Sequence, residues 1–152
     1  MQTQLLEKFE TVEVDASDLG QPLSLATDGS VATLEALIED RAPSTVREAL
    51  GVSILPEIHR TVRPVAQLND GELKKLAIAV LATEPDNVRL AVVGHGSFSR
   101  EALEREIEEG TFVGQRFISA VKQHAMFLEA AVAQGKLRRK RPVSKLTFPE
   151  LD

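Results

Sequence analysis

The pattern of apolar and polar residues changes once along the chain, near residue 30. Before that point, Val12 and Val14 alternate with acidic residues, and Leu23 and Leu25 lie two apart between turn signals, so we predict two short strands. After it, apolar residues recur every three or four positions, which is the spacing of one helix face. We therefore predict helices over residues 30–40, 45–50, 55–62, 70–83, 99–109 and 111–134.

One apolar run, residues 88–93, is too short for periodicity to assign. The helical surroundings favour a helix there, and a strand would make the fold α+β. We expect a mainly α fold: a compact multi-helix bundle with a small β element at its amino-terminal end. The length of 152 residues is typical of one domain, and we assign residues 1–135 to a helical domain and residues 136–152 to a basic tail.

The last predicted helix carries a wide apolar stripe. Ile118, Ala125 and Phe127 broaden this stripe beyond one face, which is typical of a helix central to a bundle or of an interface helix. We expect a protein partner, or a second copy of the chain, to bind at the residues of the stripe with large side chains: Phe117, Val121, Leu128 and Val132.

Charge is distributed unevenly along the chain, whose formal net charge is −5. The first 40 residues hold nine acids and one base, whereas a cluster of bases follows the last helix. Three interpretations stay open: binding of a polyanion such as nucleic acid, cations favoured at a helix end, and contact with the acidic amino-terminal strand or a protein partner. The bases that would bind a polyanion are Lys136, Arg138, Arg139, Lys140 and Arg141.

Beyond the bases, Leu146 and Phe148 alternate with polar residues. An extended segment of this kind can add to an exposed sheet edge. The edge would be the predicted strand near Val12 and Val14 or an edge of another protein, so we count Leu146 and Phe148 among the partner-binding residues.

Few residues suggest chemistry. The chain has no cysteine, and His59, His95 and His124 do not have the spacing of metal ligands. Residues 94–97 are Gly-His-Gly-Ser, and their main-chain N–H groups could approach a phosphate if these residues joined a strand to a helix. Their spacing, however, matches neither the P-loop motif nor the G-x-G-x-x-G motif of nucleotide-binding proteins. We expect no catalytic residue, no metal and no cofactor.

These patterns predict a non-enzymatic adaptor or regulatory protein that acts through its long helix and tail. The amino-terminal residues lack the layout of a signal peptide, and no apolar run approaches the roughly 20 residues of a membrane span, so we expect a cytoplasmic protein without membrane contact. One alternative is a nucleic-acid-binding regulator, since a helical body with a charged tail is similar to some bacterial antitoxins. Another is a small nucleotide or phosphate binder at residues 94–97.

Overall fold

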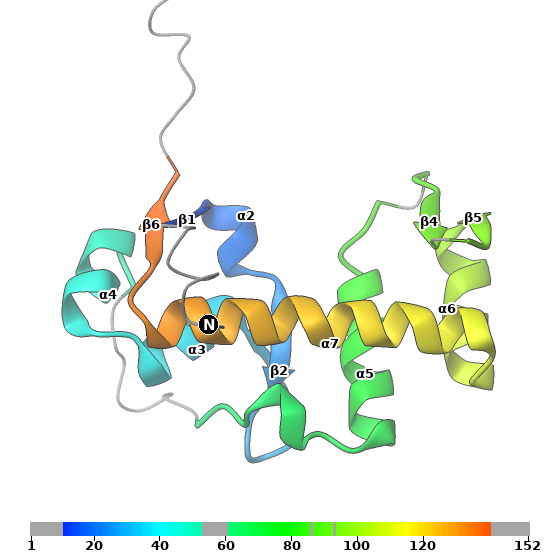
Figure 1. Ribbon diagram of the computed structural model, residues 1–152, viewed down its shortest axis with the longest axis horizontal. Coiled ribbons are helices and arrows are strands. Elements are labelled where there is room, and N and C mark those ends of the chain that lie inside the picture. Colours follow the sequence, from blue (N-terminus) through cyan, green and yellow to red (C-terminus); the bar gives the residue numbers. More distant parts are fainter. Residues whose placement is uncertain (1–10, 53–60, 86, 93, 141–152) are drawn as a thin grey trace, which may run out of the picture.

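The computed structural model describes residues 11–52, 61–85, 87–92 and 94–140 (Figure 1). The elements of the first half are β1 (Val12–Val14), α2 (Ala16–Leu19), β2 (Pro22–Leu25), β3 (Val31–Thr33), α3 (Leu34–Arg41) and α4 (Ser44–Leu50). Those of the second half are the 3-10 turn η2 (Val65–Gln67), α5 (Asp70–Leu81), β4 (Leu90–Val92), β5 (Gly96–Phe98), α6 (Arg100–Glu109), α7 (Phe112–Ala133) and β6 (Leu137–Arg139).

The fold is mixed α/β, so the expectation of a mainly α bundle with β structure only near the amino terminus is wrong. Helices account for 55% and strands for 18% of the described residues. The strands form three separate pairs: β1 with β6 in parallel, and β2 with β3 and β4 with β5 antiparallel. Each strand has three or four residues, too few for a twofold alternation to stand out from a helical pattern.

Two of these strands lie where helix was favoured. Val31–Thr33 is β3, and α3 starts only after Thr33, whose side chain accepts a hydrogen bond from the Ala36 N–H and caps the helix in place of Ser30. Leu90–Val92 is β4, which confirms the strand alternative for part of residues 88–93. Both strands owe their conformation to a partner strand rather than to local propensity, because β-strand preference depends on cross-strand packing.

Helices α4, α5, α6 and α7 follow the sequence closely. The short helix α2 was not predicted, although Asp15 caps it through a capping box with Asp18. Asn69 caps α5 through a capping box with Glu72, Ser99 caps α6, and Thr111 caps α7. Gly51 and Gly110 end α4 and α6 in the left-handed conformation. The predicted helix over residues 55–62 lies mostly outside the described residues.

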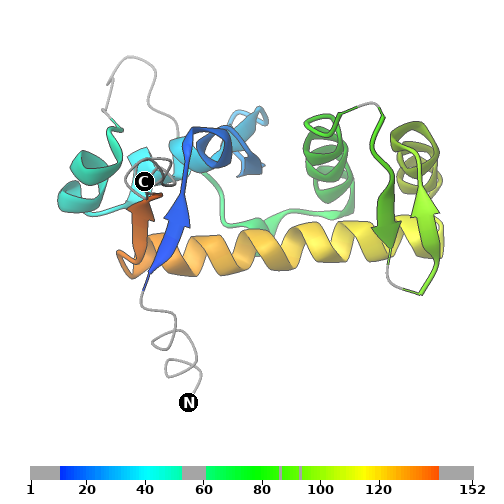
Figure 2. The same ribbon diagram turned by 90° about the horizontal axis from the view of Figure 1, so that it is seen from above.

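The long helix α7 runs the length of the molecule (Figures 1 and 2). Beside its carboxyl-terminal half, α3, α4 and the strands β1, β2, β3 and β6 bury one apolar cluster that includes Leu37, Leu128 and Val132. Beside its amino-terminal half, α5, α6, β4 and β5 bury a second cluster that includes Leu103 and Ile107. The two clusters meet at Ile118 and Val121, which pack against both.

The segment between residues 61 and 69 joins α3, α7 and the start of α5 around the first cluster, to which Val62, Val65 and Leu68 belong. The Val62 N–H donates to Asp40 Oδ2 at 3.0 Å, and the Val65 N–H donates to Glu129 Oε2 of α7 at 2.8 Å. The Arg63 guanidinium forms two hydrogen bonds to the Glu72 carboxylate, at 2.6 and 3.1 Å. These bonds satisfy main-chain groups that have no strand partner and fix the start of α5.

Candidate functional site

The large apolar residues predicted on α7 fall into two groups. Leu128 and Val132 are buried in the first cluster. Phe117 and Val121 are only half-buried, so their side chains stay accessible. The tail residues Leu146, Phe148 and Arg141 lie outside the described residues.

The basic residues are placed beside acids of the amino-terminal strand. Leu137–Arg139 forms β6, in parallel register with β1, and sets Arg138 opposite Glu13. The Arg138 guanidinium donates to Glu13 Oε2 at 2.7 Å. Of the three interpretations of the basic cluster, the structure shows the intramolecular contact at Arg138. Binding of a polyanion by these residues stays a prediction.

Two further cations of this run have close neighbours. Lys140 lies near Asp15, where it adds to a lowering of the pKa of Asp15 that is caused mainly by a hydrogen bond from the Asp18 N–H. The Arg139 guanidinium lies beside Gly51 at the end of α4. Lys136, whose carbonyl accepts from the Val12 N–H at 2.7 Å, begins the pairing with β1.

Residues 94–97 form a hairpin turn and the start of β5, not a loop between a strand and a helix. Gly94 and Gly96 both have φ near +84°, a conformation that favours glycine. The His95 N–H donates to the Val92 carbonyl at 2.8 Å, and its ring lies edge-on to Phe112, with centroids 5.3 Å apart. The strand–loop–helix geometry on which a phosphate site depends is therefore not formed.

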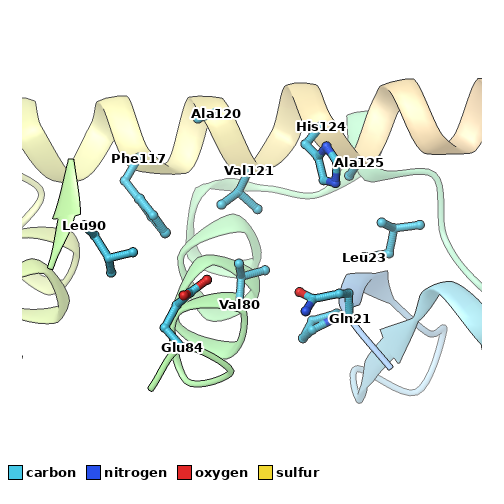
Figure 3. A pocket seen from close by; sticks show the side chains of 11 residues that line it. Gln21, Leu23, Val80, Glu84, Leu90, Phe117, Ala120, Val121, His124 and Ala125 are labelled. Atoms are coloured by element: carbon cyan, nitrogen blue, oxygen red, sulfur yellow. The ribbon is translucent and has the colours of Figure 1, made fainter. Parts of the chain in front are cut away.

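A groove crosses the middle of α7, and we call it the α7 groove (Figure 3). Its cavity has a volume of about 200 Å³ and lies between α7, the end of α5, β2 and β4. Most of its lining side chains are apolar. The lining residues are Gln21, Pro22, Leu23, Val80, Glu84, Leu90, Phe117, Ala120, Val121, His124 and Ala125.

The groove exists because the two apolar clusters do not cover the whole length of α7. His124 lies on the same helix face as Val121 and Leu128, since residues three and four apart are neighbours on a helix. Leu128 is buried against the first cluster, with 7% of its surface exposed. His124, on the same face, is exposed. The face that α7 turns inward is therefore only partly covered for about two turns, between Phe117 and His124.

Three polar side chains stand around this apolar surface. His124 extends from α7, Gln21 from the start of β2, and Glu84 from just beyond α5 (Figure 3). The Glu84 carboxylate points toward Phe117 and Val121. Its main-chain carbonyl, on the other hand, accepts a hydrogen bond from Arg100 Nη1 at 2.7 Å.

Sequence reasoning found only part of this groove. It identified Phe117 and Val121 from their helical spacing. It missed Gln21, Val80, Glu84 and Leu90, because these residues come from three other elements and only the packing of those elements against α7 brings them together. No local signal marks Glu84, which follows the helix as an ordinary polar residue.

The groove has the composition of a recognition site: an apolar surface with a few polar groups at defined positions. Within the described ranges, no three His, Asp or Glu side chains converge as a metal site. Among the helices that the structure describes, none is both long enough and apolar enough to cross a membrane.

Comparisons with known proteins found no match: no family model, no curated protein and no solved structure matches the chain.

Proposed function

We propose that this chain is a non-enzymatic adaptor or regulatory protein that binds a protein partner at the α7 groove. The observation that carries the proposal is the partly covered inward face of α7, where Phe117 and Val121 stay half-buried in the groove between the two clusters. Burial of this apolar surface by a partner would remove it from water, which lowers the free energy of the complex.

The size of the groove favours a side chain over a small molecule. Its volume is about 200 Å³, whereas small-molecule sites occupy roughly 300–1,000 Å³. A cavity of this size suits one large anchoring side chain of a protein partner, the arrangement found at the centres of many interfaces.

Apolar surface also continues along α7 beyond the groove. Phe127, one turn after His124, is 38% exposed. A partner seated on His124 and Ala120 would reach Phe127 as well, which would enlarge the interface beyond the cavity itself.

A position-specific crosslinking experiment tests this proposal. A photo-reactive phenylalanine derivative replaces Ala120, which is exposed in the groove, or Ser119, which is exposed on the same turn but does not line the groove. We expect a protein partner to be crosslinked from position 120 and not from position 119. Equal capture from both positions, or capture from neither, would contradict the proposal.

Matched substitutions then measure the effect on binding. Ala120→Arg places a long charged side chain over the groove and is expected to weaken binding of the captured partner at least about tenfold. Ser119→Arg should leave binding unchanged, and both variants should keep the stability of the parent chain within about 0.5 kcal/mol because both sites are exposed. The Leu146→Asp/Phe148→Asp double variant tests whether the tail contributes to the same interaction.

A further inference from the structure

The chemistry of the α7 groove points to one kind of anchoring group. Among the lining residues that the structure describes, Glu84 is the one carboxylate, and no lysine or arginine is present. The Glu84 side chain is half-buried and points into the cavity toward Phe117 and Val121 (Figure 3). It forms no ion pair with any residue in the described part of the chain.

A carboxylate in this position can form a stabilising, charge-assisted hydrogen bond with a cation that enters the groove. Its surroundings on the cavity side are apolar, so a charge-assisted hydrogen bond there is screened less than on an open surface. The Arg100 guanidinium is hydrogen-bonded to the main-chain carbonyl of Glu84 and forms no ion pair with its carboxylate in the described part of the chain. The negative charge that faces the cavity is thus left for a ligand.

The apolar walls suit the stem of the same ligand. Lysine and arginine bury their methylene stems against apolar surface while the charged head meets a polar group. Phe117 and Val121 supply such a surface, and the face of an aromatic ring such as Phe117 also attracts a cation. Ala120 has a small side chain, so the mouth of the groove is open to an entering chain.

We infer that the α7 groove takes a lysine or arginine side chain of the protein partner, with the stem against Phe117 and Val121 and the cation at Glu84. This inference rests on the proposed function and specifies the chemistry of the partner. The Gln21 amide and the His124 imidazole stand at the opposite side of the groove, where they can hydrogen-bond the main chain that carries the basic side chain.

Titration with small probes tests the charge preference without a known partner. Hexylammonium, hexanol and hexanoate share one stem and differ in charge. Binding to the full chain is followed by the amide resonances of Ala120, Val121 and His124. We expect hexylammonium to bind about tenfold more tightly than hexanoate, with hexanol between them.

The variant Glu84→Gln keeps the shape of the side chain and removes its charge. In this variant the three probes should bind within about twofold of one another. The control Glu101→Gln, on the exposed side of α6, should retain the tenfold preference.

The outcomes separate the two proposals. Binding of all three probes with equal affinity to the parent chain, or saturable binding by none, would overturn the assignment of a cationic anchor. Loss of partner crosslinking at position 120 is a separate observation and would overturn the proposed function. A several-fold gain in hexylammonium affinity in a Lys145→Ala variant would show that the chain's own terminal segment competes for the groove, and would overturn the assignment to a partner.

Discussion

At the scale of single residues, the closest approach of two helices depends on Gly114. This residue lies in the first turn of α7, and a Cβ atom built on it would stand 2.2 Å from the Glu106 carbonyl oxygen and 2.8 Å from the Ile107 Cα. These are main-chain atoms, which cannot move aside as the end of a flexible side chain can. The absence of a side chain at residue 114 is therefore what lets α7 pack directly on α6.

Gly114→Ala should accordingly destabilise the protein by about 1–3 kcal/mol, the usual cost of overpacking. Gly71→Ala is the matched control, because its Cβ would meet no atom closer than 3.6 Å; alanine there should be neutral or stabilising by up to about 1 kcal/mol. Urea unfolding followed by circular dichroism measures both changes. Equal stability of the two variants would contradict the close packing of α6 and α7.

A second residue-scale prediction concerns acid sensitivity. The Arg63 guanidinium, hydrogen-bonded to the Glu72 carboxylate, holds the pKa of Glu72 below its usual value, and the Asn69 N–H lowers it further. Because the folded pKa is depressed, the unfolded chain binds the proton more readily. The stabilisation is complete above the unfolded pKa of about 4.3 and is lost as the pH falls through the folded value.

Glu72→Gln should therefore unfold more easily than the parent chain at pH 7 and show a smaller loss of stability between pH 5 and pH 3. Urea titrations at several pH values measure the two slopes. Glu109→Gln, an exposed substitution at the end of α6, should keep the slope of the parent. An unchanged slope in Glu72→Gln would show that the Arg63–Glu72 pair does not contribute to acid sensitivity.

At the scale of elements, β6 pairs in parallel with β1, the first strand that the structure describes. Leu137 is 4% exposed and belongs to the first apolar cluster, and Lys140 closes the ladder with a hydrogen bond from its N–H to the Val14 carbonyl at 2.7 Å. The exposed ion pair of Arg138 with Glu13 adds little, since such pairs contribute about 0–1 kcal/mol. Burial of Leu137 is the larger stabilising contribution of β6.

A chain that ends at Gly135 should thus be less stable than one that ends at Lys140 by about 2–4 kcal/mol, the order of a deleted buried leucine. Thermal unfolding followed by circular dichroism compares the two with the full chain. The Glu13→Ala/Arg138→Ala variant controls for the ion pair and should lose about 1 kcal/mol or less. Equal melting temperatures for the two truncated chains would contradict a structural role for β6.

At the scale of the whole molecule, α7 makes one folding unit of two apolar clusters. Ile118 and Val121 touch both clusters, and the segment of Val62 and Val65 is hydrogen-bonded to α3 on one side and to α7 on the other. Unfolding of one cluster would expose Ile118 and Val121 and so remove contacts that these residues make with the other cluster. The two clusters should therefore unfold together.

Leu37→Ala in the first cluster and Leu103→Ala in the second test this coupling. Both leucines are fully buried, so each change should cost about 2–5 kcal/mol and lower the midpoint of a single shared transition. Hydrogen exchange of amides in α3 and α6 reports the clusters separately. A Leu103→Ala variant in which only the α6 amides lose protection would show that the clusters unfold independently.

Local signals in the sequence predict helices α4, α5, α6 and α7. Asn69 with Glu72, Ser99 and Thr111 mark helix starts, Gly51 and Gly110 mark ends, and the apolar stripe of α7 is visible in its spacing. These features involve residues within a few positions of one another, so their free energies are present in the local chain. Two strands were also predicted correctly: β1 at Val12 and Val14, and β2 at Leu23 and Leu25.

The remaining strands and the groove depend on the packing of segments that are remote in the sequence or on pairing with another strand. β3 and β4 contain apolar residues that suit a helix equally well, and pairing with β2 and β5 selects the extended form. The groove depends on where two clusters stop along α7, and it joins Gln21, Glu84 and His124 across about a hundred positions of the sequence. No short-range pattern encodes such a distance, because contacts between remote segments form only when the whole chain has packed.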